Sequence, residues 1–230
     1  MASRLFALRV DAVQPERLAG FWAAILGWER DGVLLSPPGG GGFRLRFVPE
    51  QDPKTVPNLM HFDLTSDTLA DQERTVARAL ELGGRHIDIG QGPDVEHVVL
   101  ADPEGNEFCV IEPGNSFLDG CGFIGAVSSD GSPRVGHFWA EALGWPLIWD
   151  QDEETAIQSS DGGSKITWGG PPYQPRSRKL RWAYELIPPP GGDRDAEADR
   201  LIALGAARTG TRDGDLLMSD PDGNEFRLLG

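Results

Sequence analysis

The chain has 230 residues, of which 39% are hydrophobic and 25% charged, an ordinary composition for a globular protein of one large or two smaller domains. Its 36 acidic and 21 basic residues give a formal net charge of −15, which argues against nucleic acids and anionic membranes as partners. The two cysteines, Cys109 and Cys121, are too few for a disulfide scaffold, and no CxxC metal motif is present.

Location is predicted from the same features. The first residues, MASRLFALRV, lack the uninterrupted apolar core of a secretory signal, and no stretch approaches the ~20 apolar residues of a membrane span. Few cysteines suit a reducing compartment. We therefore expect a cytoplasmic protein without a membrane partner.

The first quarter of the chain predicts a strand, a helix and two further strands. ALRVDAV at 7–13 alternates apolar and polar residues, as a half-buried strand does. A helix begins at Pro15, which suits a first helical position, and ends at Gly27, which suits a left-handed cap. The strands GVLLSPP at 32–38 and GFRLRFV at 42–48 flank a glycine-rich turn.

The second quarter repeats this order. LMHFDLT at 59–65 predicts a strand, and the segment 68–84 predicts a helix that ends in two glycines. EHVVLAD at 96–102 and NEFCVIE at 106–112 predict two strands joined by the turn DPEG.

The second half of the chain repeats the first. FWAAILGWE at 21–29 returns as FWAEALGWP at 138–146, and ADPEGNEF at 101–108 returns as SDPDGNEF at 219–226. Matches this long in one register indicate a tandem duplication. The predicted elements of this half are the strands 125–131, 155–160, 165–170, 180–187, 215–220 and 225–230 and the helices 137–145 and 197–206.

Domain boundaries follow from the repeat. The segment PGNSFLDGCG at 113–122 is rich in glycine and turn residues, and it lies between the two copies. We expect an N-terminal domain at 1–113, a linker at 114–122 and a C-terminal domain at 123–230.

Four strand–helix–strand–strand–strand units, with helices ending in LGW and hairpins of the DPEGNEF type, resemble the vicinal oxygen chelate superfamily, which includes glyoxalases, bleomycin-resistance proteins and extradiol dioxygenases. The resemblance covers nearly the whole chain. It implies an α+β fold of two tandem glyoxalase-like domains, in which curved mixed sheets from paired modules form open clefts. Each half of the chain is expected to contain one cleft. Since this superfamily hosts many activities, the resemblance specifies the fold more closely than the activity.

The resemblance also implies where a divalent metal ion would be held. In the N-terminal half, the expected ligand positions fall at Ala7, Phe47, His61 and Glu112, of which only His61 and Glu112 carry donor groups. Such a pair could act without a metal, with Glu112 as base and His61 as proton donor. It could also form an incomplete metal site for Zn, Ni, Fe or Mn, or be an ordinary hydrogen-bonded pair.

The C-terminal half offers no donor at the equivalent positions. These fall near Ile124, Trp168, Ala183 and Gly230. We therefore expect this half to bind no metal by the family's route.

Aromatic residues give the second set of candidate site residues. Trp168 and Trp182 fall on strands expected to line the C-terminal cleft, where their flat rings could stack on a planar ligand. Phe47 occupies a ligand position in the N-terminal half. The alternative is that these rings fill a closed cleft as core.

Three functions stay open from the sequence. The first is a binding protein that holds a small, partly aromatic molecule, and it is favoured because metal ligands are missing and tryptophans added. The second is an enzyme, a glyoxalase-like lyase or isomerase or an extradiol-type dioxygenase, that uses His61 and Glu112. In the third, the C-terminal half is a scaffold. The chain is expected to be a monomer or a homodimer.

Overall fold

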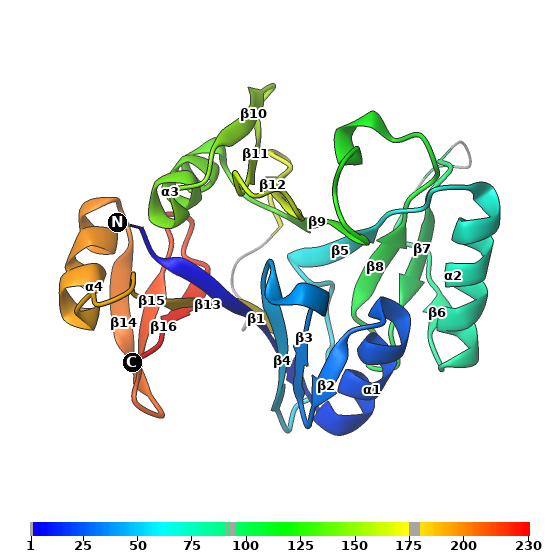
Figure 1. The fold of residues 1–230 in the computed structure, drawn as a ribbon, viewed down its shortest axis with the longest axis horizontal. Coiled ribbons are helices and arrows are strands. Elements are labelled where there is room, and N and C mark those ends of the chain that lie inside the picture. The colour runs from blue at the N-terminus through cyan, green and yellow to red at the C-terminus, as the bar shows by residue number, and fades with distance from the viewer. Residues whose placement is uncertain (1, 91, 93–94, 175–179) are drawn as a thin grey trace.

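The computed structural model describes residues 2–90, 92, 95–174 and 180–230, and its elements follow the order of four similar modules (Figure 1). The first module contains β1 (Arg4–Ala12), α1 (Pro15–Leu26), β2 (Glu29–Asp31), β3 (Leu34–Ser36) and β4 (Arg44–Pro49). The second contains β5 (Met60–Leu64), α2 (Leu69–Glu81), β6 (Arg85–His86), β7 (Val98–Ala101) and β8 (Glu107–Val110). The third contains β9 (Ile124–Ser129), α3 (Pro133–Leu143), β10 (Leu147–Gln151), β11 (Glu154–Gln158) and β12 (Lys165–Trp168). The fourth contains β13 (Trp182–Ile187), α4 (Arg194–Ala203), β14 (Ala207–Arg212), β15 (Asp215–Ser219) and β16 (Glu225–Leu228), and short 3-10 turns lie at Pro38–Gly40 and Ser116–Leu118.

Helix α1 begins at Pro15 and ends before Gly27 as the sequence predicts, whereas α3 begins at Pro133, four residues before the predicted start at 137, and ends before Gly144. Pro15 and Pro133 are the first residues of α1 and α3. Gly27 and Gly144 follow these helices with φ of 66° and 65°, the left-handed conformation that glycine adopts without steric cost. The α+β class and the four-module pattern are thereby confirmed.

The strands form two eight-stranded mixed sheets, and each sheet combines modules from both halves of the chain. Sheet A has the order β14-β15-β16-β13-β1-β4-β3-β2, and sheet B has the order β10-β11-β12-β9-β5-β8-β7-β6. In the middle of the molecule β1 lies antiparallel to β13, and β5 lies antiparallel to β9 (Figure 1). The expectation that each half contains its own cleft is therefore wrong, because modules 1 and 4 share one sheet and modules 2 and 3 share the other.

The physical reason lies in what each half buries by itself. Trp22 of α1 packs edge-on against Phe62 and Phe108 of module 2, with ring centroids 5.2 and 5.1 Å apart. Trp139 of α3 makes the same contacts with Tyr184 and Phe226, at 4.9 and 5.1 Å. Modules within a half therefore meet through their core faces. The backbone edges of β1 and β5 still need hydrogen-bond partners, and the other half supplies them.

The repeated DPEGNEF and DPDGNEF hairpins anchor these tryptophans. Asp102 is fully buried and accepts hydrogen bonds from the indole N–H of Trp22, the side-chain amide of Asn106 and two backbone N–H groups. Asp220 makes the equivalent bonds to Trp139 and Asn224. The motif thus builds the turn and ties it to the helix, in both halves alike.

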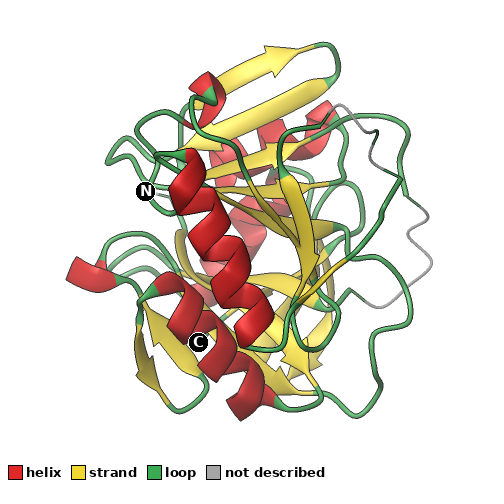
Figure 2. Cartoon of the chain, turned by 90° about the vertical axis from the view of Figure 1, so that its right-hand side faces the viewer, coloured by secondary structure: helices red, strands yellow, loops and turns green. Residues whose placement is uncertain are grey.

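Helices α1 and α2 lie against each other on the outer side of the N-terminal half (Figures 1 and 2). Among the described residues, every helix is too short or too polar to cross a lipid bilayer. Each sheet presents one face to the core beside the helices, and we call the opposite face its outer face.

Candidate functional site

A large open cleft of about 1190 Å³ lies on the outer face of sheet B. It crosses the junction of β5 and β9, where modules 2 and 3 meet, and continues over β11 and β12. His61, Ser128, Lys165 and Thr167 line it, because alternate residues of a strand point to the same face of a sheet.

Three donor side chains gather on this face. His61 and Asp63 lie two residues apart on β5, and Cys109 of β8 lies directly beside Asp63 in the strand register. One ligand atom from each of the three lies within 4.8 Å of the other two. His61 Nε2 is 3.4 Å from Asp63 Oδ1, so imidazole and carboxylate form an ion pair when His61 is protonated.

Module 3 extends this cluster through a chain of hydroxyl groups. Ser128 of β9 lies beside His61 in the register, and its Oγ donates a hydrogen bond to Asp63 Oδ2. Thr167 of β12 in turn hydrogen-bonds Ser128 Oγ at 3.2 Å. Hydrogen bonds therefore link the polar side chains of module 2 to those of module 3 across the junction of the two halves.

The surroundings change how these groups titrate. Burial alone would lower the pKa of His61, but hydrogen bonds to Asp63 and Cys109 raise it to about 10. Burial would raise the pKa of Asp63, and the hydrogen bond to His61 outweighs it and lowers that pKa. Burial raises the pKa of the Cys109 thiol. At neutral pH the cluster therefore holds an imidazolium, a carboxylate and a neutral thiol.

Aromatic side chains also line the cleft. Phe117, from the connection between β8 and β9, meets Trp149 of β10 edge-on with ring centroids 6.3 Å apart. The ammonium group of Lys165 lies 4.6 Å from the Phe117 ring centroid and donates to the Phe117 carbonyl oxygen. About two fifths of Trp149 and of Phe117 remains exposed, 39% and 37% respectively. Polar groups on the floor and flat rings on the wall suit a small molecule with a planar part.

Comparison with known proteins identifies the family of this chain. The model of the glyoxalase-like domain family matches residues 7–111 and again residues 126–229. The chain belongs to the glyoxalase-like domain family. A search among curated proteins finds no match.

Solved structures show that the arrangement of all four modules recurs. Glyoxalase I from Zea mays superposes with a TM-score of 0.71 at 15% identity, over 99% of this chain and 92% of that one. A Bacillus subtilis protein described as a candidate dioxygenase superposes with a TM-score of 0.60 at 14% identity, over 99% of this chain and 86% of that one. At such identities the likeness concerns the fold.

Within this glyoxalase-like fold, the two residues predicted as an acid–base pair occupy different places. His61 lies in the cleft, near the start of β5. Glu112 lies farther along the sheet. The N–H of its neighbour Ile111 donates to the carbonyl oxygen of Leu64. Leu64 is three residues beyond His61 on β5, or roughly 10 Å at the usual rise of a strand. The Glu112 carboxylate accepts from Asn115 Nδ2 at 3.2 Å and lines a separate small pocket beside the 112–121 connection. The structure brings His61 to Asp63 and Cys109 instead.

The aromatic candidates of the glyoxalase-like chain lie deeper than expected. Phe47 is fully buried and faces the core. Trp168 and Trp182 are each 2% exposed. Trp168 reaches the edge of the large cleft, whereas Trp182 packs on Phe62 with ring centroids 4.7 Å apart.

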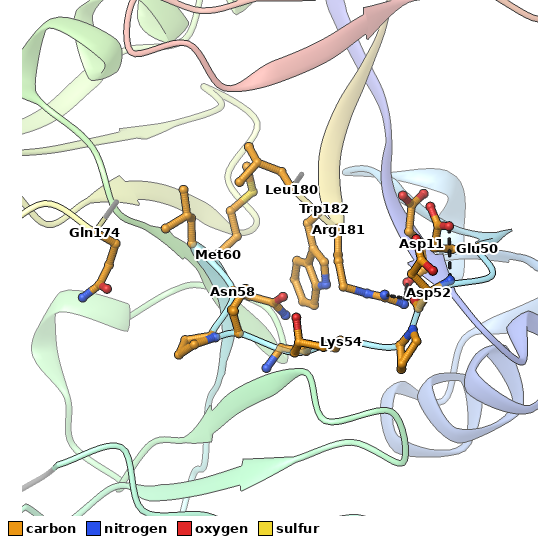
Figure 3. A pocket seen from close by; sticks show the side chains of 15 residues that line it. Asp11, Glu50, Asp52, Lys54, Asn58, Met60, Gln174, Leu180, Arg181 and Trp182 are labelled. Carbon is orange, nitrogen blue, oxygen red and sulfur yellow. Dashed lines mark hydrogen bonds between the residues drawn. The ribbon is translucent and has the colours of Figure 1, made fainter. Parts of the chain in front are cut away.

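Trp182 also lines a second pocket, of about 250 Å³, at the junction of the halves. Figure 3 shows its indole beside Asn58, Lys54 and Arg181. Arg181 donates to the backbone oxygens of Asp11 and Asp52 and so ties the connection before β5 to the start of β13. This pocket lies between the segment 50–60 and residues 180–182 at the start of β13.

Sequence reasoning missed Asp63, Cys109 and Ser128 as site residues. Asp63 had a signal, since it stands at i+2 from His61 and therefore shares its face of the strand. Cys109 had none, because its place beside Asp63 depends on the register between β5 and β8. Ser128 had none, because its place beside His61 depends on the pairing of β5 with β9.

The ion pair of His61 predicts a pH dependence of stability. Because the pKa of His61 is higher in the folded than in the unfolded protein, its ion pair stabilises the fold fully below about pH 6.5. This stabilisation is lost as the pH rises through about 10. Thermal melts of the wild type and of His61→Gln, recorded from pH 6 to 10, should show the wild type losing its advantage across this range. The loss should be moderate, since 36% of the His61 side chain is exposed and solvent screens the pair. His86→Gln is the control, and equal slopes for wild type and His61→Gln would contradict the assignment.

Proposed function

We propose that this glyoxalase-like protein binds a small, partly aromatic molecule in the cleft on the outer face of sheet B. The proposal rests on the mixed lining of the cleft. Phe117 and Trp149 offer flat aromatic surfaces. His61, Ser128 and Thr167 offer polar groups that can form hydrogen bonds with a ligand. The cleft's size of about 1190 Å³ accommodates a ligand of several rings.

The test is a thermal-shift screen of planar aromatic compounds below about 500 Da, followed by calorimetry of the hits, since pockets of this kind take ligands of that size. Trp149→Ala should weaken binding about tenfold, because a buried aromatic stack contributes on the order of 1 kcal/mol or more. Ile202→Ala is the matched control, since Ile202 is an exposed apolar residue of α4, outside the cleft. Binding that is indifferent to Trp149→Ala and to Ser128→Ala would exclude this cleft as the site.

A second function is favoured by the donor cluster itself. His61, Asp63 and Cys109 offer nitrogen, oxygen and sulfur ligands within 4.8 Å of one another, a set that suits a borderline ion such as Zn²⁺ rather than Mg²⁺ or Ca²⁺. These residues would hold the ion, and the ion would polarise an oxygen atom of a bound molecule. Ser128 would keep Asp63 oriented through its hydrogen bond, and Trp149 would position the planar part of the substrate.

This metal-dependent alternative, a lyase, isomerase or dioxygenase activity, predicts a sharp dependence on pH. Zn²⁺ would displace the protons of His61 and Cys109, both of which have raised pKa values, so its apparent affinity should increase from pH 6 to pH 9. Metal analysis of protein purified without chelator, followed by Zn²⁺ titration, tests this. His61→Ala and Cys109→Ser should lose the ion, whereas Cys121→Ser should keep it. Substoichiometric metal at pH 9 would leave the metal-free binding protein as the function.

A further inference from the structure

Sheet A carries a different set of side chains at the positions that form the donor cluster in sheet B. The pair Asp63–Cys109 of β5 and β8 corresponds in register to Glu185–Arg227 of β13 and β16. His61 corresponds to Ala183, and its neighbour Ser128 corresponds to Arg9, which lies beside Ala183. At these positions sheet A thus has the carboxylate found in sheet B, but neither its imidazole nor its thiol.

Arginines also replace the remaining polar residues. Thr167 of β12 corresponds to Arg46 of β4, which lies beside Arg9. Lys165 corresponds to Arg44, which lies beside Ala7. The outer face of sheet A therefore gathers four guanidinium groups around two alanines, and we call Arg9, Arg44, Arg46 and Arg227 the arginine cluster.

Carboxylates neutralise this cluster only in part. Arg46 Nε lies 3.3 Å from Glu185 Oε2, Arg9 pairs with Asp11 at 3.1 Å, and Arg227 is 3.6 Å from Asp215. Among the described residues Arg44 has no carboxylate partner, and its guanidinium lies over the Phe6 ring at 4.8 Å from the centroid. Four cations therefore face three anions, on a chain whose net charge is −15.

The cluster is buried on one side and open on the other. Arg227 and Glu185 are 2% and 1% exposed, and Arg227 Nε has no hydrogen-bond partner among the described residues. The Arg46 side chain is 33% exposed and so reaches solvent. Burial lowers the pKa of Arg9, and its closeness to Arg227 lowers it further despite Asp11. Guanidinium groups that repel one another at the rim of a buried face are stabilised by an added anion.

We propose that the arginine cluster is a second ligand site, which binds a small oxyanion, a carboxylate or phosphate group, on the outer face of sheet A. Arg44 and Arg46 contact the anion from the solvent side, and Arg9 and Arg227 supply positive charge from below. Glu185 is the internal counter-ion that offsets part of this positive charge before the anion arrives. The site is independent of the cleft on sheet B, so either can fail without the other.

Calorimetric titration with inorganic phosphate and, separately, with malonate tests the proposal at an ionic strength held constant with chloride. Saturable binding is expected, and Arg46→Gln and Arg44→Gln should each weaken it about tenfold, as loss of one charge-assisted hydrogen bond does. Tighter binding of malonate would assign a carboxylate ligand, and tighter binding of phosphate a phosphorylated one. Circular dichroism verifies that each variant is folded.

Two variants separate this site from general charge effects. Arg74→Gln, at an exposed position of α2 and away from sheet A, should leave binding unchanged. Glu185→Gln removes the counter-ion and should tighten binding severalfold. Absence of saturable binding by either anion, or equal weakening in Arg74→Gln, would overturn the proposal, as would loss of binding in His61→Gln but not in Arg46→Gln.

Discussion

Replacement of Asp102 by alanine is expected to lower the free energy of unfolding by about 4 kcal/mol, because it strands several buried donors at once. The Trp22 indole, the Asn106 amide and two backbone N–H groups all donate to this one carboxylate. Burial raises the pKa of Asp102 to about 6 in spite of these bonds, which shows how much of its solvation the bonds must replace.

Denaturant unfolding of the purified variant measures this loss. Asp220→Ala should cost nearly as much, since Asp220 makes the equivalent bonds to Trp139 and Asn224. Asp161→Ala, at an exposed loop position, should stay within about 0.5 kcal/mol of the wild type. If Asp102→Ala were as stable as Asp161→Ala, the hairpin would not anchor the helix.

The N-terminal segment 1–113, expressed alone, is expected to dimerise. It contains its own aromatic core around Trp22 but leaves the edges of β1 and β5 without their partners β13 and β9. Because the halves are repeats, a second copy can supply β5 to pair with β1, and β1 to pair with β5. The resulting two-fold dimer would rebuild both sheets.

Size-exclusion chromatography with light scattering distinguishes the outcomes. A dimer of 1–113 that gives way to a heterodimer when 123–230 is added would match the pairing seen in the full chain. A folded monomer of 1–113, stable at micromolar concentration, would show that β1 and β5 do not need these partners.

The sequence predicted the site only in part, and the reasons are specific. His61 was found because the family resemblance implies a metal-ligand position on its strand. Glu112 was chosen by counting to the end of its strand, whereas the register places Cys109, three residues earlier, beside Asp63. Trp168 and Trp182 were correctly placed on strands, but alternation alone does not tell which face of a strand is turned to the core.

By itself, the sequence determined the four modules, both ends of α1 and the turn chemistry of the hairpins, because these depend on local periodicity and on residues such as Pro15 and Gly27. Only the tertiary structure decided which modules share a sheet. Strand edges are alike in their backbone groups, so the choice of partner rests on packing across the whole chain. That choice sets Ser128 beside His61 on one sheet and Arg9 beside Ala183 on the other, and it gives the two faces their different chemistry.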